Sequence, residues 1–110
     1  MAWVYLIAAG ITEIVWAVGL KYSDGFKKPA ASVFTVIVML LSFVLLSQAM
    51  RKMPLGTAYA VWTGIGAVGT VLYGMFALNE PRDWPRILCV VLIIGGIVGL
   101  KAMTPAVDPQ

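Results

Sequence analysis

Long apolar runs alternate with short polar connections along this chain. Four segments contain almost only apolar or small side chains, and the first three reach the roughly 20 residues that a helix needs to cross a bilayer. The segments are residues 2–20, 30–50, 55–78 and 87–100. The fourth is short, and we expect it to gain length from Trp84 at one end and from Lys101, which can extend its ammonium group toward the interface, at the other. The pattern predicts four transmembrane helices, approximately 2–20, 30–50, 55–78 and 84–103.

Charged residues, glycine and proline gather in three brief connections, at residues 21–29, 51–54 and 79–86. Residues of these types end helices and form turns. Short connections make consecutive helices run antiparallel, so the two termini and the second connection should share one side of the membrane. We therefore expect residues 1–110 to form one all-α transmembrane domain whose first helix is retained, because the basic start of a signal peptide is missing.

Composition agrees with this assignment. Of the 110 residues, 61% are hydrophobic and 12% are charged, whereas charged residues make up about a quarter of a soluble domain. The net charge of +3 is spread over several connections, without the basic run that favours nucleic-acid binding. Histidine is absent and Cys89 is the only cysteine, which excludes an intrachain disulfide and argues against a metal site. We expect no cofactor, and Cys89 is interpreted as a small packing residue.

Basic residues are divided almost evenly between the two predicted sides of the membrane. On the side of the termini lie Arg51, Lys52 and Lys101, and on the other side lie Lys21, Lys27, Lys28, Arg82 and Arg86. Cytoplasmic connections normally carry an excess of Lys and Arg, and a small excess gives a weak preference for one orientation. The chain is therefore predicted to insert in both orientations.

Glu13 is the one charged residue in the middle of the first apolar segment. A carboxylate at the centre of a membrane span costs roughly 2.5–3.5 kcal/mol, so its presence requires a functional or structural reason. Intramembrane acids usually mark ion or proton pathways, and a protonated acid that only joins helices by a hydrogen bond is the alternative. On a helix, Gly10, Glu13 and Trp16 share one face. The spacing thus predicts a site with space on one side of Glu13 and an indole on the other.

Polar and aromatic side chains in the second and third segments are candidate neighbours of this carboxylate. Ser42 is the clearest polar side chain near the middle of its segment, although a membrane serine often bonds only its own i−4 carbonyl. Tyr59 and Trp62 lie inside an apolar run, and each has a polar group that needs a partner when buried. We predict that Trp16, Ser42, Tyr59 and Trp62 line the site and donate hydrogen bonds to Glu13.

Two glycine patterns have different interpretations. Residues 64–69 match the dinucleotide motif GxGxxG, but that chemistry needs a strand, a turn and a helix N-terminus, so inside a membrane span the match is a false positive. These glycines are expected to allow close helix approach or a bend, with packing favoured. Gly95 and Gly99 form a GxxxG pair with Gly96 beside them, which predicts a helix–helix dimer seam.

The chain contains no phosphate-binding GxxxxGK[ST] motif, so ATP-driven pumping within this chain is excluded. We expect a transporter rather than an enzyme. A weak acid in a low-dielectric place lets a proton and a cation compete for one group, which is what an antiporter requires. Four short helices are too few to enclose a gated pathway, so at least a dimer is predicted. Two oppositely inserted copies would reproduce the inverted repeat of many transporters.

These residues resemble the small multidrug resistance family of four-helix, proton-coupled exporters that work as antiparallel dimers. The resemblance rests on the Glu13 helix, residues 20–26 (LKYSDGF), residues 54–64 (PLGTAYAVWTG) and Glu80-Pro81. Trp16, one turn from Glu13, and the following Gly19-Leu20-Lys21-Tyr22 are similar to the guanidinium-exporting branch. The resemblance implies that Glu13 binds both proton and substrate, that Trp16, Ser42, Tyr59 and Trp62 line the site, and that the protein resides in a bacterial inner or plasma membrane.

Three functions stay open on this evidence. The first is guanidinium/proton exchange, because guanidinium is a small planar cation that matches a carboxylate bidentately. The second is export of quaternary-ammonium or other drug-like cations by a member of the same family. The third is a membrane scaffold that transports nothing.

Overall fold

The chain forms four helices and no strand within residues 2–103, the part that the computed structural model describes. The helices are α1 (Ala2–Tyr22), α2 (Pro29–Met50), α3 (Leu55–Ala77) and α4 (Trp84–Met103). Each is long and apolar enough to cross a membrane. The predicted all-α membrane fold is confirmed, and α4 extends beyond the apolar segment 87–100 at both ends.

The first connection is built around the buried Ser23. Its hydroxyl donates to the Leu20 carbonyl at 2.7 Å and accepts from the Phe26 amide at 3.2 Å, and its own carbonyl accepts from the Lys27 amide at 2.9 Å. Gly25 has a φ of +69°, a left-handed conformation that costs glycine little. The chain reverses here within a few residues, and Pro29 then occupies the start of α2, where a missing amide proton is harmless.

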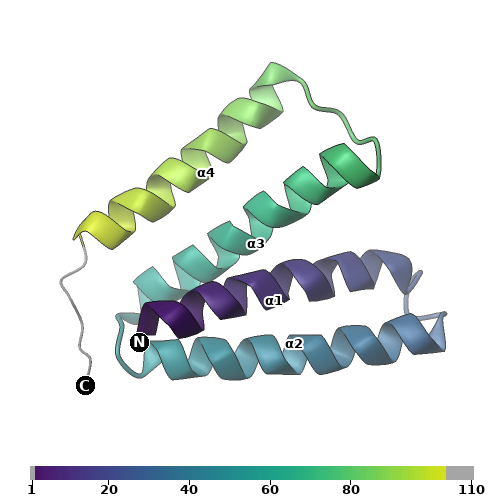
Figure 1. Ribbon diagram of the computed structural model, residues 1–110, viewed down its shortest axis with the longest axis horizontal. Coiled ribbons are helices and arrows are strands. Elements are labelled where there is room, and N and C mark those ends of the chain that lie inside the picture. Colours follow the sequence, from purple (N-terminus) through teal and green to yellow (C-terminus); the bar gives the residue numbers. More distant parts are fainter. Residues whose placement is uncertain (1, 104–110) are drawn as a thin grey trace.

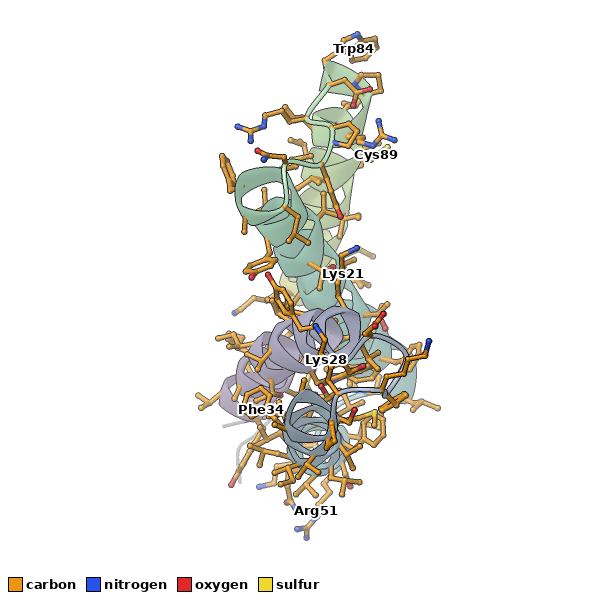
Figure 2. The ribbon with its side chains drawn as sticks, turned by 90° about the vertical axis from the view of Figure 1, so that its right-hand side faces the viewer. Lys21, Lys28, Phe34, Arg51, Trp84 and Cys89 are labelled. Carbon is orange, nitrogen blue, oxygen red and sulfur yellow. The ribbon has the colours of Figure 1, made fainter. Side chains whose placement is uncertain are left out.

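The helices lie in one row, in the spatial order α2, α1, α3, α4 (Figures 1 and 2). The molecule measures 42 × 35 × 16 Å along its principal axes. The shortest of these, the thickness of the row, is only a little more than the diameter of a single helix with its side chains, about 10–12 Å. Consecutive helices run in opposite directions, as the short connections predict (Figure 1). Because the helices lie side by side, the two broad faces of the row are largely uncovered by other helices within residues 2–103.

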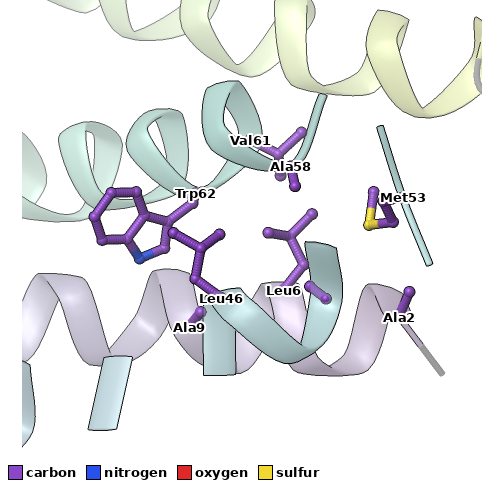
Figure 3. Packing of buried hydrophobic residues seen from close by; sticks show 9 residues of the cluster. Ala2, Leu6, Ala9, Leu46, Met53, Ala58, Val61 and Trp62 are labelled. Carbon is purple, nitrogen blue, oxygen red and sulfur yellow. The ribbon is translucent and has the colours of Figure 1, made fainter. Parts of the chain in front are cut away.

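The apolar core joins α1, α2 and α3 at the end where α1 begins (Figure 3). Most of its members are small or branched apolar side chains, and the cluster consists of Ala2, Leu6, Ala9, Leu46, Ala49, Met53, Ala58, Val61 and Trp62. Large apolar side chains elsewhere are exposed, for example Ile37 at 61% and Leu92 at 65%. Such exposure suits a surface that meets lipid rather than water.

Among the described helices, α4 packs mainly against α3. Val90 is its one buried residue among those described. At the far end, the Lys101 ammonium lies 5.0 Å from the centre of the Trp3 ring, a cation–π contact that links α4 to the start of α1. Within residues 2–103, a Cβ at Gly95, Gly96 or Gly99 would meet nothing within 4 Å, so the predicted seam glycines face away from the other three helices.

Candidate functional site around Glu13

Helix α1 meets α3 along a seam of glycines. A Cβ at Gly10 would approach the Ile65 side chain at 2.6 Å, and a Cβ at Gly69 would collide with Ile14. Between these contacts, a Cβ at Gly66 would collide with the Glu13 carboxylate. The absence of side chains at these positions therefore allows the two helices to approach and gives the carboxylate its place.

The Glu13 carboxylate is half-buried, and its Oε1 atom is buried without a hydrogen-bond partner among residues 2–103. One turn later, the Trp16 indole nitrogen is also buried without a partner in the same range. A buried polar group without a partner costs about 1–3 kcal/mol. The arrangement thus presents an acceptor and a donor, both on α1, whose hydrogen-bonding capacity is free to be used by a bound molecule.

Ser42 and Trp62 form a hydrogen-bond chain beside this site. The Trp62 indole donates to the Ser42 hydroxyl at 3.1 Å, and that hydroxyl donates to the Ala9 carbonyl at 2.9 Å. The chain connects α3, α2 and α1. The prediction that these two side chains donate to Glu13 is wrong for this structure, because each donates to another acceptor. The alternative that Ser42 bonds only its own helix is also wrong, because its hydroxyl donates to a carbonyl of α1.

Aromatic rings continue from the site across all three helices. Phe43 lies between two tryptophans, with ring centres 6.4 Å from Trp16 and 6.0 Å from Trp62, both edge to face. The Tyr59 ring lies 5.6 Å from Trp62, and its side chain is 54% exposed, so the structure does not bring its hydroxyl to Glu13. Edge-to-face rings pack favourably and hold one another in orientation.

Phe43 and Gly66 are not among the predicted site residues. An apolar ring such as Phe43, in an apolar span, carries no signal of its own in the sequence, although Phe43 follows Ser42 directly. Gly66 is part of the rejected GxGxxG match, and its actual role is packing: Gly66 and Gly69 admit side chains of α1, and a Cβ at Gly64 would approach Ile97 of α4 at 2.9 Å. The packing interpretation of these glycines is confirmed.

A cavity of about 290 Å³ opens one turn farther along the seam, where Ala17 and Thr70 follow Glu13 and Gly66 by four residues each. The Thr70 hydroxyl donates to the Gly66 carbonyl at 2.8 Å. The cavity therefore begins one turn from the carboxylate, along the same seam between α1 and α3.

Similarity to known proteins supports the assignment of the fold. The model of the family described as Small Multidrug Resistance protein matches residues 1–93. A protein named guanidinium exporter from Yersinia pseudotuberculosis is 52% identical over 101 residues, covering 92% of this chain and 97% of its own. Proteins of the same name from Citrobacter freundii and Salmonella typhimurium are each 50% identical over 104 residues, covering 94% of this chain and 99% of their own.

These relatives are named as exporters, and the four apolar helices give the chain the form of a multi-pass protein of the bacterial inner membrane. Because the family model covers most of the chain and the relatives align with it almost from end to end, the chain belongs to the Small Multidrug Resistance protein family.

Proposed function

We propose that this protein exports guanidinium in exchange for protons, with both cations bound in turn at Glu13. The observation that carries the proposal is the Glu13 carboxylate, which is held over Gly66 in the middle of α1 with Oε1 buried and unpartnered within residues 2–103. A carboxylate in this position binds a proton or a cation, but not both at once.

Guanidinium fits the chemistry of the site. Its planar fork of N–H groups can donate two parallel hydrogen bonds to one carboxylate, and the flat cation can lie against the faces of Trp16 and Trp62. The Ser42–Trp62 hydrogen bond would keep the Trp62 ring in place while the cargo changes. The name guanidinium exporter, carried by relatives of 50–52% identity, agrees with this substrate.

We infer further that the working unit is an antiparallel homodimer with dual topology. A row of helices 16 Å thick leaves the Glu13 region covered by its own chain on part of its surface only. A second copy inserted in the opposite sense would close the site and make inward-open and outward-open states equivalent. The nearly even division of basic residues, three against five, is compatible with insertion in both senses.

The contact between the two copies is proposed to include α4. Gly95, Gly96 and Gly99 would meet nothing within 4 Å if they carried a Cβ. Small residues at this spacing let two helices approach closely in a membrane. This seam would leave α1, α2 and α3 of each copy to surround the two Glu13 side chains.

The experiment is proton-coupled flux in liposomes loaded with the purified protein. Guanidinium should accumulate against its gradient when a proton gradient is imposed, and tetraalkylammonium should not. Glu13→Gln should abolish coupled transport while the protein remains a dimer, because the amide keeps the volume and loses the charge. Transport of tetraalkylammonium alone would instead support the drug-exporting alternative, and no flux of either cation would support a scaffold.

A further inference from the structure

A second carboxylate lines the cavity that lies one turn beyond Glu13 on the α1–α3 seam. Glu80 lies at the end of the α1–α3 seam and lines the 290 Å³ cavity together with Ala17, Lys21, Thr70 and Tyr73. It also lines a neighbouring cavity of about 520 Å³ between α3 and α4. The connection from α3 to α4, which carries Glu80, lies at the same end of the helices as the connection from α1 to α2 (Figure 1).

Backbone hydrogen bonds at the end of α3 position Glu80 over that helix. Asn79 adopts a left-handed conformation with φ of +56°, which ends α3. The Glu80 amide then turns back to donate to the Gly74 carbonyl at 3.0 Å, and the Arg82 guanidinium donates to the Met75 carbonyl. This cap fixes the start of the Glu80 side chain relative to the helix.

Glu13 and Glu80 share one kind of contact. A Cβ at Gly74 would collide with the Glu80 carboxylate, as a Cβ at Gly66 would collide with that of Glu13. The two glycines are eight positions apart on α3, which is about 12 Å along the helix axis. Small side chains, Ala17 and Thr70, line the interval. The two carboxylates thus lie over the same helix, and the cavity that Glu80 lines ends one turn short of Glu13.

The surroundings of Glu80 suit weak binding of a cation that dissociates quickly. Within residues 2–103, its carboxylate has no hydrogen bond or ion pair, so both oxygens can accept. The Tyr73 ring lines the cavity beside it, and the Tyr73 and Tyr22 hydroxyls are hydrogen-bonded at 2.8 Å. Lys21 lines the same cavity and lies at this end of α1 (Figure 2). Its like charge would weaken the binding of any cation.

We propose that Glu80 forms an outer binding site for the transported cation, through which guanidinium passes on its way to or from Glu13. This inference rests on the proposed transport of guanidinium. The carboxylate accepts the planar cation bidentately, the Tyr73 ring offers it a face, and Lys21 opposes long residence. Because Glu80 is exposed to solvent, the outer site binds the cation weakly. It affects how readily guanidinium enters from solution, rather than the exchange of guanidinium and proton at Glu13.

The test compares guanidinium flux through reconstituted wild type, Glu80→Gln, Glu80→Asp and Asp83→Asn. Glu80→Gln should raise KM about two- to fivefold, the range of a partly exposed ion pair, with kcat nearly unchanged, and Glu80→Asp should recover part of the loss. Asp83→Asn is the matched control: it removes one negative charge from the same connection, but Asp83 pairs with the exposed Arg86 at 3.0 Å and lies outside the cavity lining. It should leave KM unchanged.

A second variant is expected to change KM in the opposite direction. Lys21→Gln should lower KM, because it removes the like charge that faces the cation, and the difference between wild type and Glu80→Gln should shrink at high ionic strength. A structural role of Glu80 would reproduce neither effect. Equal KM for wild type and Glu80→Gln, or a loss of kcat with KM unchanged, would overturn the outer site. Failure of the wild type to carry guanidinium would overturn the proposed function itself, and the outer site with it.

Discussion

The Glu13 carboxylate occupies the space that a side chain on Gly66 would need. The two residues come from different helices, and Gly66 is buried, so the α1–α3 contact brings the carboxylate against the backbone of α3. The position of the proposed substrate site therefore depends on the smallest residue of α3 as much as on the acid itself.

Gly66→Ala should displace the carboxylate or separate the helices. Overpacking of this kind costs about 1–3 kcal/mol of stability, and a loss of the same size in binding free energy would lower guanidinium affinity about 5- to 160-fold. Gly56→Ala is the control on the same helix, because a Cβ at Gly56 meets nothing within 4 Å. The guanidinium affinities of the two purified variants are measured and compared. Equal affinities would show that the carboxylate does not depend on this contact.

Trp62→Phe should impair transport more than Trp3→Phe. The first change removes the hydrogen bond to Ser42, worth about 0.5–1.5 kcal/mol, and frees the ring beside the site. The second retains an aromatic face near Lys101, which lies 5.0 Å from the Trp3 ring centre. Initial rates of guanidinium flux should fall about two- to tenfold for Trp62→Phe and little for Trp3→Phe.

A double-variant cycle with Ser42→Ala identifies the source of that loss. If Trp62 acts through Ser42, the combined variant should lose little more than either single one. Strictly additive losses would mean that each residue contacts the substrate independently. Tyr59 is also predicted from the sequence to line the site, so Tyr59→Phe is expected to impair transport. This variant serves as a comparison, because it retains the Ser42–Trp62 hydrogen bond.

Guanidinium affinity should fall as pH falls. The cation needs the ionised carboxylate, and lowering the pH increases the fraction of Glu13 that is protonated, so the proton displaces the cargo. For competition with one proton, the apparent affinity should fall by up to about tenfold per pH unit. Fluorescence of the tryptophans near the site can report binding between about pH 6 and 9. Affinity that does not change over this interval would contradict competition at Glu13.

Dual topology predicts that single cysteines react from both sides of the membrane. After Cys89 is replaced by serine, Ala30→Cys and Gly56→Cys place probes near the starts of α2 and α3. These two positions lie at opposite ends of the helices, and both are exposed. Neither change alters the count of Lys and Arg, which sets orientation. An impermeant reagent should label about half of each variant from either side. Labelling of each position from one side alone would exclude dual insertion.

Sequence and tertiary structure determine different parts of this protein. The four helices follow from the sequence, because apolar runs of bilayer length must satisfy their backbone within the helix. Glu13 stands out for a similar reason: a charge in such a run is costly wherever the helices lie. The sequence also identifies Ser42 and Trp62 as groups that need partners.

The choice of partners is decided by the tertiary structure. Trp62 donates to Ser42 rather than to Glu13, and Ser42 donates to α1 rather than to its own helix, because helix rotation and spacing determine which acceptor is within reach. The same is true of the two carboxylates. That Glu13 lies over Gly66 and Glu80 over Gly74 depends on the spatial order α2, α1, α3, α4 and on the cap of α3. Apolar patterning cannot specify these contacts, since each helix presents apolar residues on every side.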